Sequence, residues 1–103
     1  MKTRVITFGT FDIFHIGHVN ILKRAAALGD ELIVGVSSDA LNIRKKGRAP
    51  VYAERDRVNI IHSLGCVDKV FVEQSLELKR QYIQDFKAGL TGMNINVIRR
   101  RRV

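Results

Sequence analysis

Residues 9–18 read GTFDIFHIGH, and they lie where a strand-like segment gives way to a helix-like one. Two histidines in this stretch, His15 and His18, are three residues apart, a spacing that places side chains on one face of a helix. The start of a helix also offers unpaired backbone N–H groups and the positive end of the helix macrodipole. The stretch therefore predicts a strand, a turn and a helix whose first turn can bind an anion.

Strand-like and helix-like patterns alternate on both sides of this stretch. Residues 4–8 (RVITF) are rich in β-branched residues and predict a first strand, and apolar residues at helical spacing predict a helix from Gly17 to Leu28. Residues 31–39 are nearly all apolar and predict a second strand, of the kind found in parallel sheets that are covered on both faces. These three elements form a strand–helix–strand unit.

The later segments continue the alternation. Ser38 or Asp39 can cap a short helix, and residues 43–51 (IRKKGRAPV) predict a basic loop. The remaining predicted elements are a helix over residues 53–65, a strand over 67–73 and a helix over 75–86. Strands that alternate with helices in this way predict an α/β fold.

Composition limits the class of protein. A chain of 103 residues predicts one domain, and its apolar content of 46% and charged content of 27% are ordinary for a globular protein. We expect no membrane span, because no apolar run approaches the length needed to cross a bilayer. The N-terminus has no apolar signal-peptide core, and the single cysteine, Cys66, cannot form an internal disulfide. A cytoplasmic protein is therefore expected.

The net charge of +8 does not identify the partner, because arginines 99–102 supply half of it. The mildly basic remainder suits a phosphorylated substrate about as well as it suits nucleic acid. Residues 89–92 (GLTG) fit the GxxG form of a KH loop, but the KH order of strands and helices is missing around them. We therefore expect no nucleic-acid partner.

Residues 9–18 can be interpreted as a phosphate site. Gly9 frees the backbone to turn at the strand end, and Gly17 leaves room for a phosphate at the helix N-terminus. The imidazoles of His15 and His18 can donate hydrogen bonds to phosphate oxygens. For an isolated HxxH pattern, the alternative is a metal-binding pair or a polar surface.

The longer string closely resembles the signature of the cytidylyltransferases within the HxGH nucleotidyltransferase superfamily. The resemblance continues through residues 45–57 (KKGRAPVYAERDR), 66–73 (CVDKVFVE) and 75–79 (SLELK), and covers roughly residues 1–86. It implies a Rossmann-like, doubly wound parallel sheet with the nucleotide at the carboxyl ends of the strands. It also implies transfer of CMP from CTP to a phosphomonoester with release of pyrophosphate, by direct in-line attack and without a covalent enzyme intermediate.

The same resemblance implies the substrates and partners. Residues 7–12 (TFGTFD) and 75–79, together with the single domain, favour glycerol 3-phosphate as the acceptor and CDP-glycerol as the product. Related sequences act on choline phosphate, ethanolamine phosphate, sugar phosphates or flavin precursors, so another phosphomonoester is the alternative. The resemblance further implies Mg²⁺ that arrives with CTP, no metal site of the protein's own, and a homodimer.

Matching positions in the family motifs imply roles for individual residues. His15 and His18 are expected to contact the triphosphate and stabilise the transition state, with Lys46 as a third catalytic residue. The other expected roles are nucleotide binding for Gly9, Thr10, Phe11 and Gly17, acceptor binding for Lys45 and Lys79, and a structural or dimer role for Asp12, Arg57 and Asp68. Ordinary solvated surface charge is the alternative interpretation of the lysines, and a surface ion pair is the alternative for Arg57.

The C-terminal residues depart from the family pattern. Family members continue with a strand, a GDDW-like turn and an RTxGxSTT-like segment that closes over CTP, and residues 87–103 contain none of these. We therefore expect a nucleotidyltransferase core over residues 1–86, an incomplete C-terminal part of the fold, and a divergent basic tail over 87–103. The alternative is a catalytically weak or inactive truncated relative that still folds and dimerises.

Overall fold

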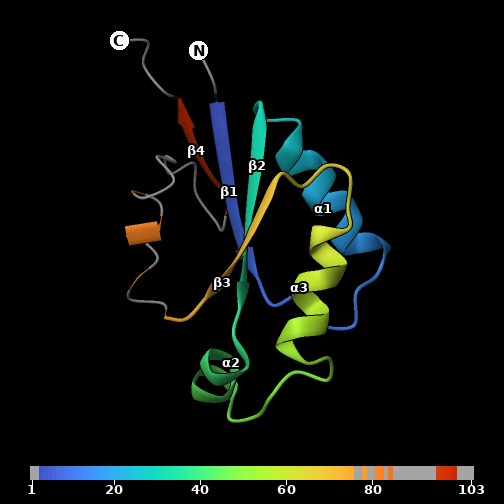
Figure 1. The fold of residues 1–103 in the computed structure, drawn as a ribbon, viewed down its shortest axis with the longest axis vertical. Helices are drawn as coiled ribbons and strands as arrows, with labels where there is room; N and C mark the ends of the chain where they lie inside the picture. The colour runs from blue at the N-terminus through green and yellow to red at the C-terminus, as the bar shows by residue number, and fades with distance from the viewer. Residues whose placement is uncertain (1–2, 76–77, 79–80, 83, 85–94, 100–103) are drawn as a thin grey trace.

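The computed structural model describes residues 3–75, 78, 81–82, 84 and 95–99. Along the first three quarters of the chain, one helix separates the first two strands and two helices separate the second strand from the third (Figure 1). The elements are β1 (Thr3–Gly9), α1 (Ile16–Ala26), β2 (Glu31–Ser37), α2 (Asp39–Lys46), α3 (Glu54–His62), β3 (Lys69–Glu73) and β4 (Ile95–Arg99). The structure confirms the three predicted strands, and it confirms the predicted helices that precede and follow β2. The bounds of the strands agree with the prediction to within a few residues. The helix predicted over residues 75–86 lies largely outside the described residues.

The strands form one sheet in the order β3-β2-β1-β4. The first three are parallel, with Val5 of β1 opposite Leu32 and Val34 of β2 opposite Val70, and they confirm the predicted α/β, Rossmann-like class. β4 runs antiparallel to β1 and pairs with residues Thr3–Thr7 alone, so the sheet is mixed rather than wholly parallel. An antiparallel edge strand on a parallel sheet is common. Phe8 and Gly9, at the carboxyl end of β1, lie beyond this pairing.

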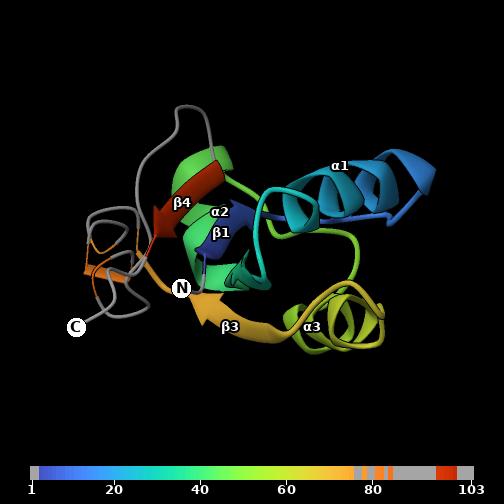
Figure 2. The same ribbon diagram turned by 90° about the horizontal axis from the view of Figure 1, so that it is seen from above.

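Helices α1 and α3 lie side by side on one face of the sheet (Figures 1 and 2). Their buried side chains Leu22, Ala25 and Ile61 pack against Val5 and Val34 of the strands. On the opposite face, the buried residues Ile6, Phe8 and Ile33 pack against Phe71 and Tyr82. Every residue from Leu32 to Ser38 is buried, which explains why the sequence of β2 is apolar without alternation.

Helix α2 is longer than the sequence predicted. It runs to Lys46, so the first four residues of the expected basic loop, 43–46, are helical. Ser38, rather than Asp39, is the N-cap, because its side chain accepts a hydrogen bond from the Leu41 N–H at 2.9 Å. Gly47 ends the helix with a φ of 78°, a left-handed conformation that glycine adopts without strain. Among the helices that the described residues form, none is long and apolar enough to cross a membrane.

Candidate active site

The loop between β1 and α1 contains two residues in an unusual backbone conformation. Phe11 and Ile13 have φ values of 54° and 47°, in the left-handed region that non-glycine residues rarely occupy. Conformations of this kind cost about 1–3 kcal/mol each and persist where surrounding contacts hold them, often at functional sites. Two side chains, those of Asp12 and Arg57, provide such contacts here.

Asp12 connects this loop to the segment that precedes α3. Its Oδ2 accepts a hydrogen bond from the Val51 N–H at 2.7 Å, and its Oδ1 accepts one from the Tyr52 N–H at 2.8 Å. Burial alone would raise the pKa of this carboxyl group, but the N–H groups of Tyr52, Val51 and Ile13 and the charge of Arg57 outweigh burial and hold the pKa below its usual value of 3.8. Asp12 is thus an ionised brace whose two oxygens are both engaged.

Arg57 joins three segments from a fully buried position on α3. Its Nη1 donates to the carbonyl oxygens of Thr10 at 2.9 Å and Ser37 at 2.8 Å, and its Nε donates to the Tyr52 carbonyl at 3.0 Å. Its Nη2 forms an ion pair with the Asp39 carboxylate at 2.6 Å. One guanidinium therefore holds together the carboxyl ends of β1 and β2 and the loop before α3.

The two histidines of the motif cap α1 reciprocally. His15 is the N-cap residue, and its Nδ1 accepts from the Gly17 N–H at 3.0 Å, while Nδ1 of His18 accepts from the His15 N–H at 3.1 Å. Because both Nδ1 atoms accept, each neutral ring carries its proton on Nε2, which is then a hydrogen-bond donor. A Cβ on Gly17 would lie 2.6 Å from Cε1 of His15, so this glycine makes room for the His15 ring.

Aromatic rings surround His18. Its ring stacks on Phe14 with centroids 5.2 Å apart, meets the edge of Phe11 at 5.7 Å, and lies 4.0 Å from the ring of His15. Burial, followed by the proximity of His15, lowers the pKa of His18 below its usual value of 6.5. His18 is therefore neutral at pH 7 and offers an N–H donor rather than a permanent charge.

The lowered pKa of His18 predicts a pH dependence. Between the lowered pKa and 6.5 the unfolded chain binds more protons at this residue than the folded chain does, so the free energy of unfolding rises with pH. This stability is complete above pH 6.5 and is lost as the pH falls from 6.5 toward the lowered value. An NMR titration of the His18 Cε1–H resonance should give a midpoint below 6.5. A midpoint above 6.5 would show that a partner stabilises the charged ring.

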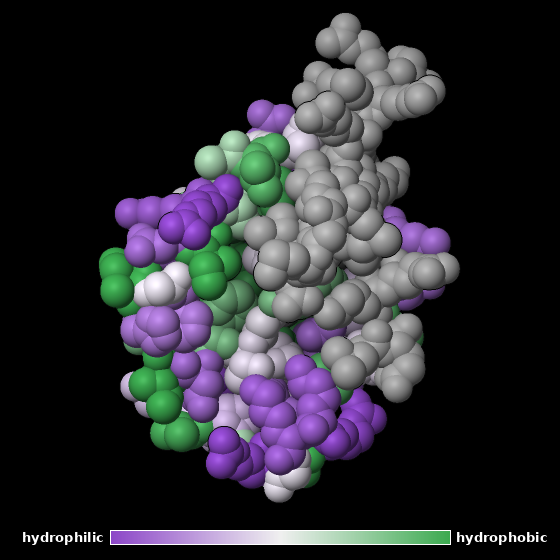
Figure 3. Space-filling model, turned by 180° about the vertical axis from the view of Figure 1, so that it is seen from behind, coloured by the Kyte–Doolittle hydropathy of each residue, from purple (hydrophilic) through white to green (hydrophobic). Residues whose placement is uncertain are grey.

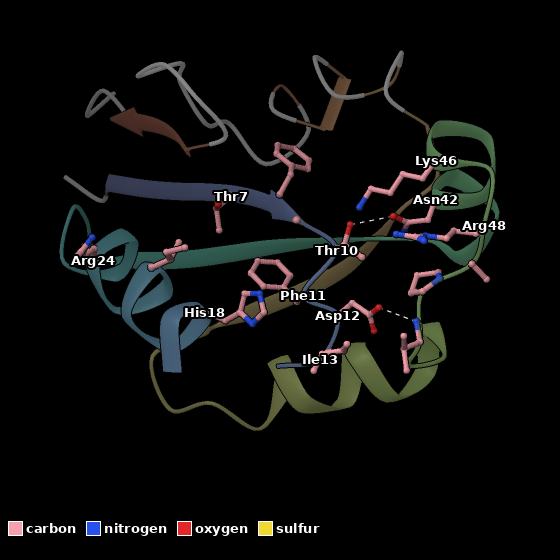
Figure 4. A pocket seen from close by; sticks show the side chains of 16 residues that line it. Thr7, Thr10, Phe11, Asp12, Ile13, His18, Arg24, Asn42, Lys46 and Arg48 are labelled. Atoms are coloured by element: carbon pink, nitrogen blue, oxygen red, sulfur yellow. Dashed lines mark hydrogen bonds between the residues drawn. The ribbon is translucent and has the colours of Figure 1, made fainter. Parts of the chain in front are cut away.

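A cavity of about 920 Å³ opens at the carboxyl end of β1 (Figure 4). Six of the residues predicted for the site line it: Gly9, Thr10, Phe11, Asp12, His18 and Lys46. The other predicted residues that the structure describes, His15, Gly17, Lys45, Arg57 and Asp68, do not line the cavity. Lys79 lies outside the described residues.

The predicted residues outside the cavity occupy three kinds of position. Three of them hold the lining residues in place without lining the cavity. His15 and Gly17 form the N-terminal cap of α1, and the buried guanidinium of Arg57 donates a hydrogen bond to the Thr10 carbonyl oxygen. Lys45 is exposed on α2. Asp68 joins β3 to the amino end of β2, where its Oδ2 accepts from the Leu32 N–H at 2.7 Å.

Several polar residues of the site were not predicted from the sequence. Asn42 lines the cavity, is fully buried, and accepts a hydrogen bond from the Thr10 hydroxyl at 3.0 Å. Its Nδ2 donates to the Ser37 hydroxyl at 3.0 Å. This network fixes the Thr10 side chain. A buried asparagine on a short helix carries no local sequence signal, because its partners are 5 and 32 residues away.

The charge of the cavity favours an anion. Arg24 and Arg48, also not predicted, line it together with Lys46, and Asp12 is the one carboxylate among the described lining residues. The surface on the far side of the view in Figure 1 is mixed in character. Hydrophilic residues gather at its lower end, and hydrophobic residues are exposed beside them (Figure 3). Among the described residues, no group of three or more His, Cys, Asp or Glu side chains could hold a metal ion.

Comparison with known proteins identifies the family. The family model described as "Cytidylyltransferase-like" matches residues 6–101, almost the whole chain. The chain belongs to the cytidylyltransferase-like family. The match begins in β1 and ends past β4, so it includes most of the segment after residue 86.

Individual relatives have different activities in their names. The chain is 38% identical over 100 residues to an FAD synthase of Thermococcus sibiricus, covering 93% of this chain and 68% of the relative. It is 42% identical over 82 residues to the glycerol-3-phosphate cytidylyltransferase of Bacillus subtilis, covering 80% and 63%. The chain thus spans about two thirds of the length of these relatives.

A solved structure supports the same fold. The crystal structure of a lipopolysaccharide core biosynthesis protein from Thermoplasma volcanium is similar to the chain, with a TM-score of 0.75 and 33% identity. The similarity covers 84% of this chain and 70% of that protein. Members of the cytidylyltransferase-like family are nucleotidyltransferases, and enzymes of this kind generally use a divalent metal together with a nucleoside triphosphate.

Proposed function

We propose that the protein transfers a nucleotidyl group from a nucleoside triphosphate to a phosphomonoester and releases pyrophosphate. The observation that carries this proposal is the convergence of His18, Lys46 and the β1–α1 loop on one cationic cavity at the carboxyl end of β1. Ligands of open α/β sheets bind at this end of the strands. The described residues that line the cavity supply donors for phosphate oxygens, among them the side chains of His18, Lys46 and Arg48.

The reaction proceeds by direct displacement. An oxygen of the acceptor phosphate forms a bond to the α-phosphorus of the triphosphate, and the bond from that phosphorus to the bridging oxygen of the β-phosphate breaks, so pyrophosphate leaves. Catalysis of such a step consists of positioning and charge stabilisation. The Nε2–H of His18 and the ammonium of Lys46 donate to the oxygens that gain charge, while Asp12 and Arg57 hold the loop in place.

We further propose that Mg²⁺ accompanies the triphosphate. Both oxygens of Asp12, the one carboxylate among the described lining residues, accept backbone hydrogen bonds, so the described part of the site offers no set of carboxylates that could hold the ion without the phosphates. When bound to the phosphates, the ion neutralises part of their charge. EDTA should therefore abolish turnover, and added Mg²⁺ should restore it. Full turnover in EDTA would contradict the requirement.

The finer proposal is that CTP is the nucleotide and glycerol 3-phosphate the acceptor, which gives CDP-glycerol. Its support is the 42% identity to a glycerol-3-phosphate cytidylyltransferase. The FAD synthase relative makes an ATP-dependent reaction on another phosphomonoester the alternative. A homodimer and a cytoplasmic location remain predictions from the sequence.

One assay separates these proposals. The full chain is incubated with Mg²⁺, CTP or ATP, and glycerol 3-phosphate or another phosphomonoester, and ³¹P NMR follows pyrophosphate and the diphosphate diester. Products formed fastest from CTP and glycerol 3-phosphate would support the finer proposal. Products formed with another pair would support nucleotidyl transfer and refute the finer choice. No pyrophosphate with any pair would contradict the proposed function.

A further inference from the structure

Asn42 has the most deeply buried polar side chain among the described residues that line the cavity, and the residue is 1% exposed. A buried amide costs free energy unless its donors and its acceptor are bonded. The residue before it on α2, Leu41, shows that an apolar side chain can fill a buried position of this helix. The hydrogen bonds of Asn42 therefore indicate what its side chain does.

These hydrogen bonds fix the orientation of the Asn42 amide. Its Nδ2 lies 2.8 Å from the Ser38 carbonyl oxygen, which can only accept, so the amide nitrogen is on that side. Nδ2 also donates to the Ser37 hydroxyl at 3.0 Å. The amide oxygen Oδ1 therefore faces Thr10, and because Oδ1 can only accept, the Thr10 hydroxyl donates its proton to Asn42 across 3.0 Å.

The Thr10 hydroxyl is consequently an acceptor for groups in the cavity. Its one proton is bonded to Asn42, and even when the Ser37 hydroxyl donates to it across 3.1 Å, one lone pair of Thr10 Oγ1 remains. A lone pair suits a donor rather than a phosphate oxygen. Lys46 supplies a donor, because it lines the same cavity, lies one helical turn after Asn42, and points toward Thr10 in Figure 4.

The ammonium of Lys46 benefits from such an acceptor. The lysine is exposed at the C-terminal end of α2, and its flexible side chain loses conformational freedom when it binds a phosphate. An acceptor that holds the ammonium beforehand reduces this cost. On the basis of the proposed function, we propose that Asn42 is a positioning residue, which through the Thr10 hydroxyl holds the Lys46 ammonium where the phosphates bind.

Variants of Asn42 and Thr10 in two backgrounds test this role, with the nucleotide and acceptor pair that the wild type uses fastest. Asn42→Leu and Thr10→Val keep much of the side-chain volume and remove the hydrogen bonds, and each should lower kcat about tenfold, as expected for loss of a hydrogen bond to a charged group. In the Lys46→Met background, which has no ammonium to hold, the same substitutions should change kcat by less than about twofold. Thr10→Ser keeps the hydroxyl and should retain the wild-type rate.

Leu41→Ala is the matched control for stability, because Leu41 is buried on the same helix and does not line the cavity. It should lower the melting temperature, as loss of a core side chain does, and change kcat by less than about twofold at a temperature where the protein is folded. A tenfold loss of kcat in Leu41→Ala would show that any loosening of α2 has the effect, and would overturn the specific role of Asn42.

The other outcomes separate this inference from the proposed function. If Asn42→Leu and Thr10→Val lower kcat by the same factor in both backgrounds, or leave it unchanged in the wild-type background, the positioning role is wrong while nucleotidyl transfer stands. If the Lys46→Met protein is too slow to assay, the affinity for inorganic triphosphate with Mg²⁺, measured by calorimetry, replaces kcat in the same comparison. Wild-type protein that neither releases pyrophosphate nor binds inorganic triphosphate would refute the proposed function and the inference with it.

Discussion

Replacing His18 with alanine should lower the rate of pyrophosphate release by about a hundredfold or more, the effect of removing one preorganised donor from a developing negative charge. The neutral ring of His18 holds its proton on Nε2, because Nδ1 accepts from the His15 N–H. The donor is thus aligned before the substrate binds. Steady-state turnover of CTP with glycerol 3-phosphate, and with the other nucleotide and acceptor pairs, measures the loss.

His18 also caps α1, so a second variant must separate the two roles. In His18→Gln the side-chain oxygen can still accept from the His15 N–H, as glutamine does at this position of a capping box. The His18→Gln variant should therefore have the melting temperature of the wild type but lose most of the turnover. His62→Ala, which removes an exposed histidine from the end of α3, should change neither. Turnover of His18→Ala within a factor of two of the wild type would refute the assigned role.

The largest effect on stability should come from Arg57→Ala, with a loss of about 3–5 kcal/mol in the free energy of unfolding. The substitution removes the donors to three backbone carbonyl oxygens and leaves the Asp39 carboxylate without its ion-pair partner. Buried acceptors that lose a partner bear their full desolvation cost. Because a domain is stable by only about 5–15 kcal/mol, this loss is a large part of the total.

Chemical denaturation monitored by circular dichroism measures this loss against a control on the same helix. Arg55→Ala removes an exposed arginine from α3 and should change the free energy of unfolding by less than about 0.5 kcal/mol. Arg57→Lys keeps the charge but cannot span the same acceptors, so it should give an intermediate loss if the alanine variant does not fold. An Arg57→Ala protein as stable as Arg55→Ala would show that the guanidinium does not hold the site together.

Local signals predicted most of the fold. The apolar run of residues 32–36 reflects a strand buried on both faces, and the apolar spacing after Gly17 matches a helix that buries Leu22 and Ala25. The extra turn of α2 was missed because residues 44–46 are all basic and Ile43 is exposed, so this turn has no apolar residue at a buried position, although the glycine at position 47 is a typical helix terminator. The antiparallel pairing of β4 was also missed, since strand direction depends on distant contacts rather than on the composition of the strand.

The sequence predicted only the part of the candidate site that lies within the motif of residues 9–18 and the basic segment that ends α2. The motif placed Gly9, Phe11 and His18 together, because the turn and the helix start bring them to one cavity. The cavity residues Asn42 and Arg24 come from other segments, and their sequence context is that of ordinary helix positions. Gly17 is predicted to admit a phosphate, and the structure adds a second reason for a glycine, because a Cβ there would collide with the closely packed His15 ring.

The central claim is that a nucleoside triphosphate binds where β1 meets α1, with its phosphates at His18. A titration of ¹⁵N-labelled protein with Mg²⁺ and CTP, followed by two-dimensional NMR, tests this claim most directly. The account predicts that the largest shifts belong to the backbone amides of Gly9 to His18 and to the His18 side chain, and that inorganic triphosphate reproduces most of them. Shifts confined to other parts of the chain, or none at millimolar CTP, would contradict it.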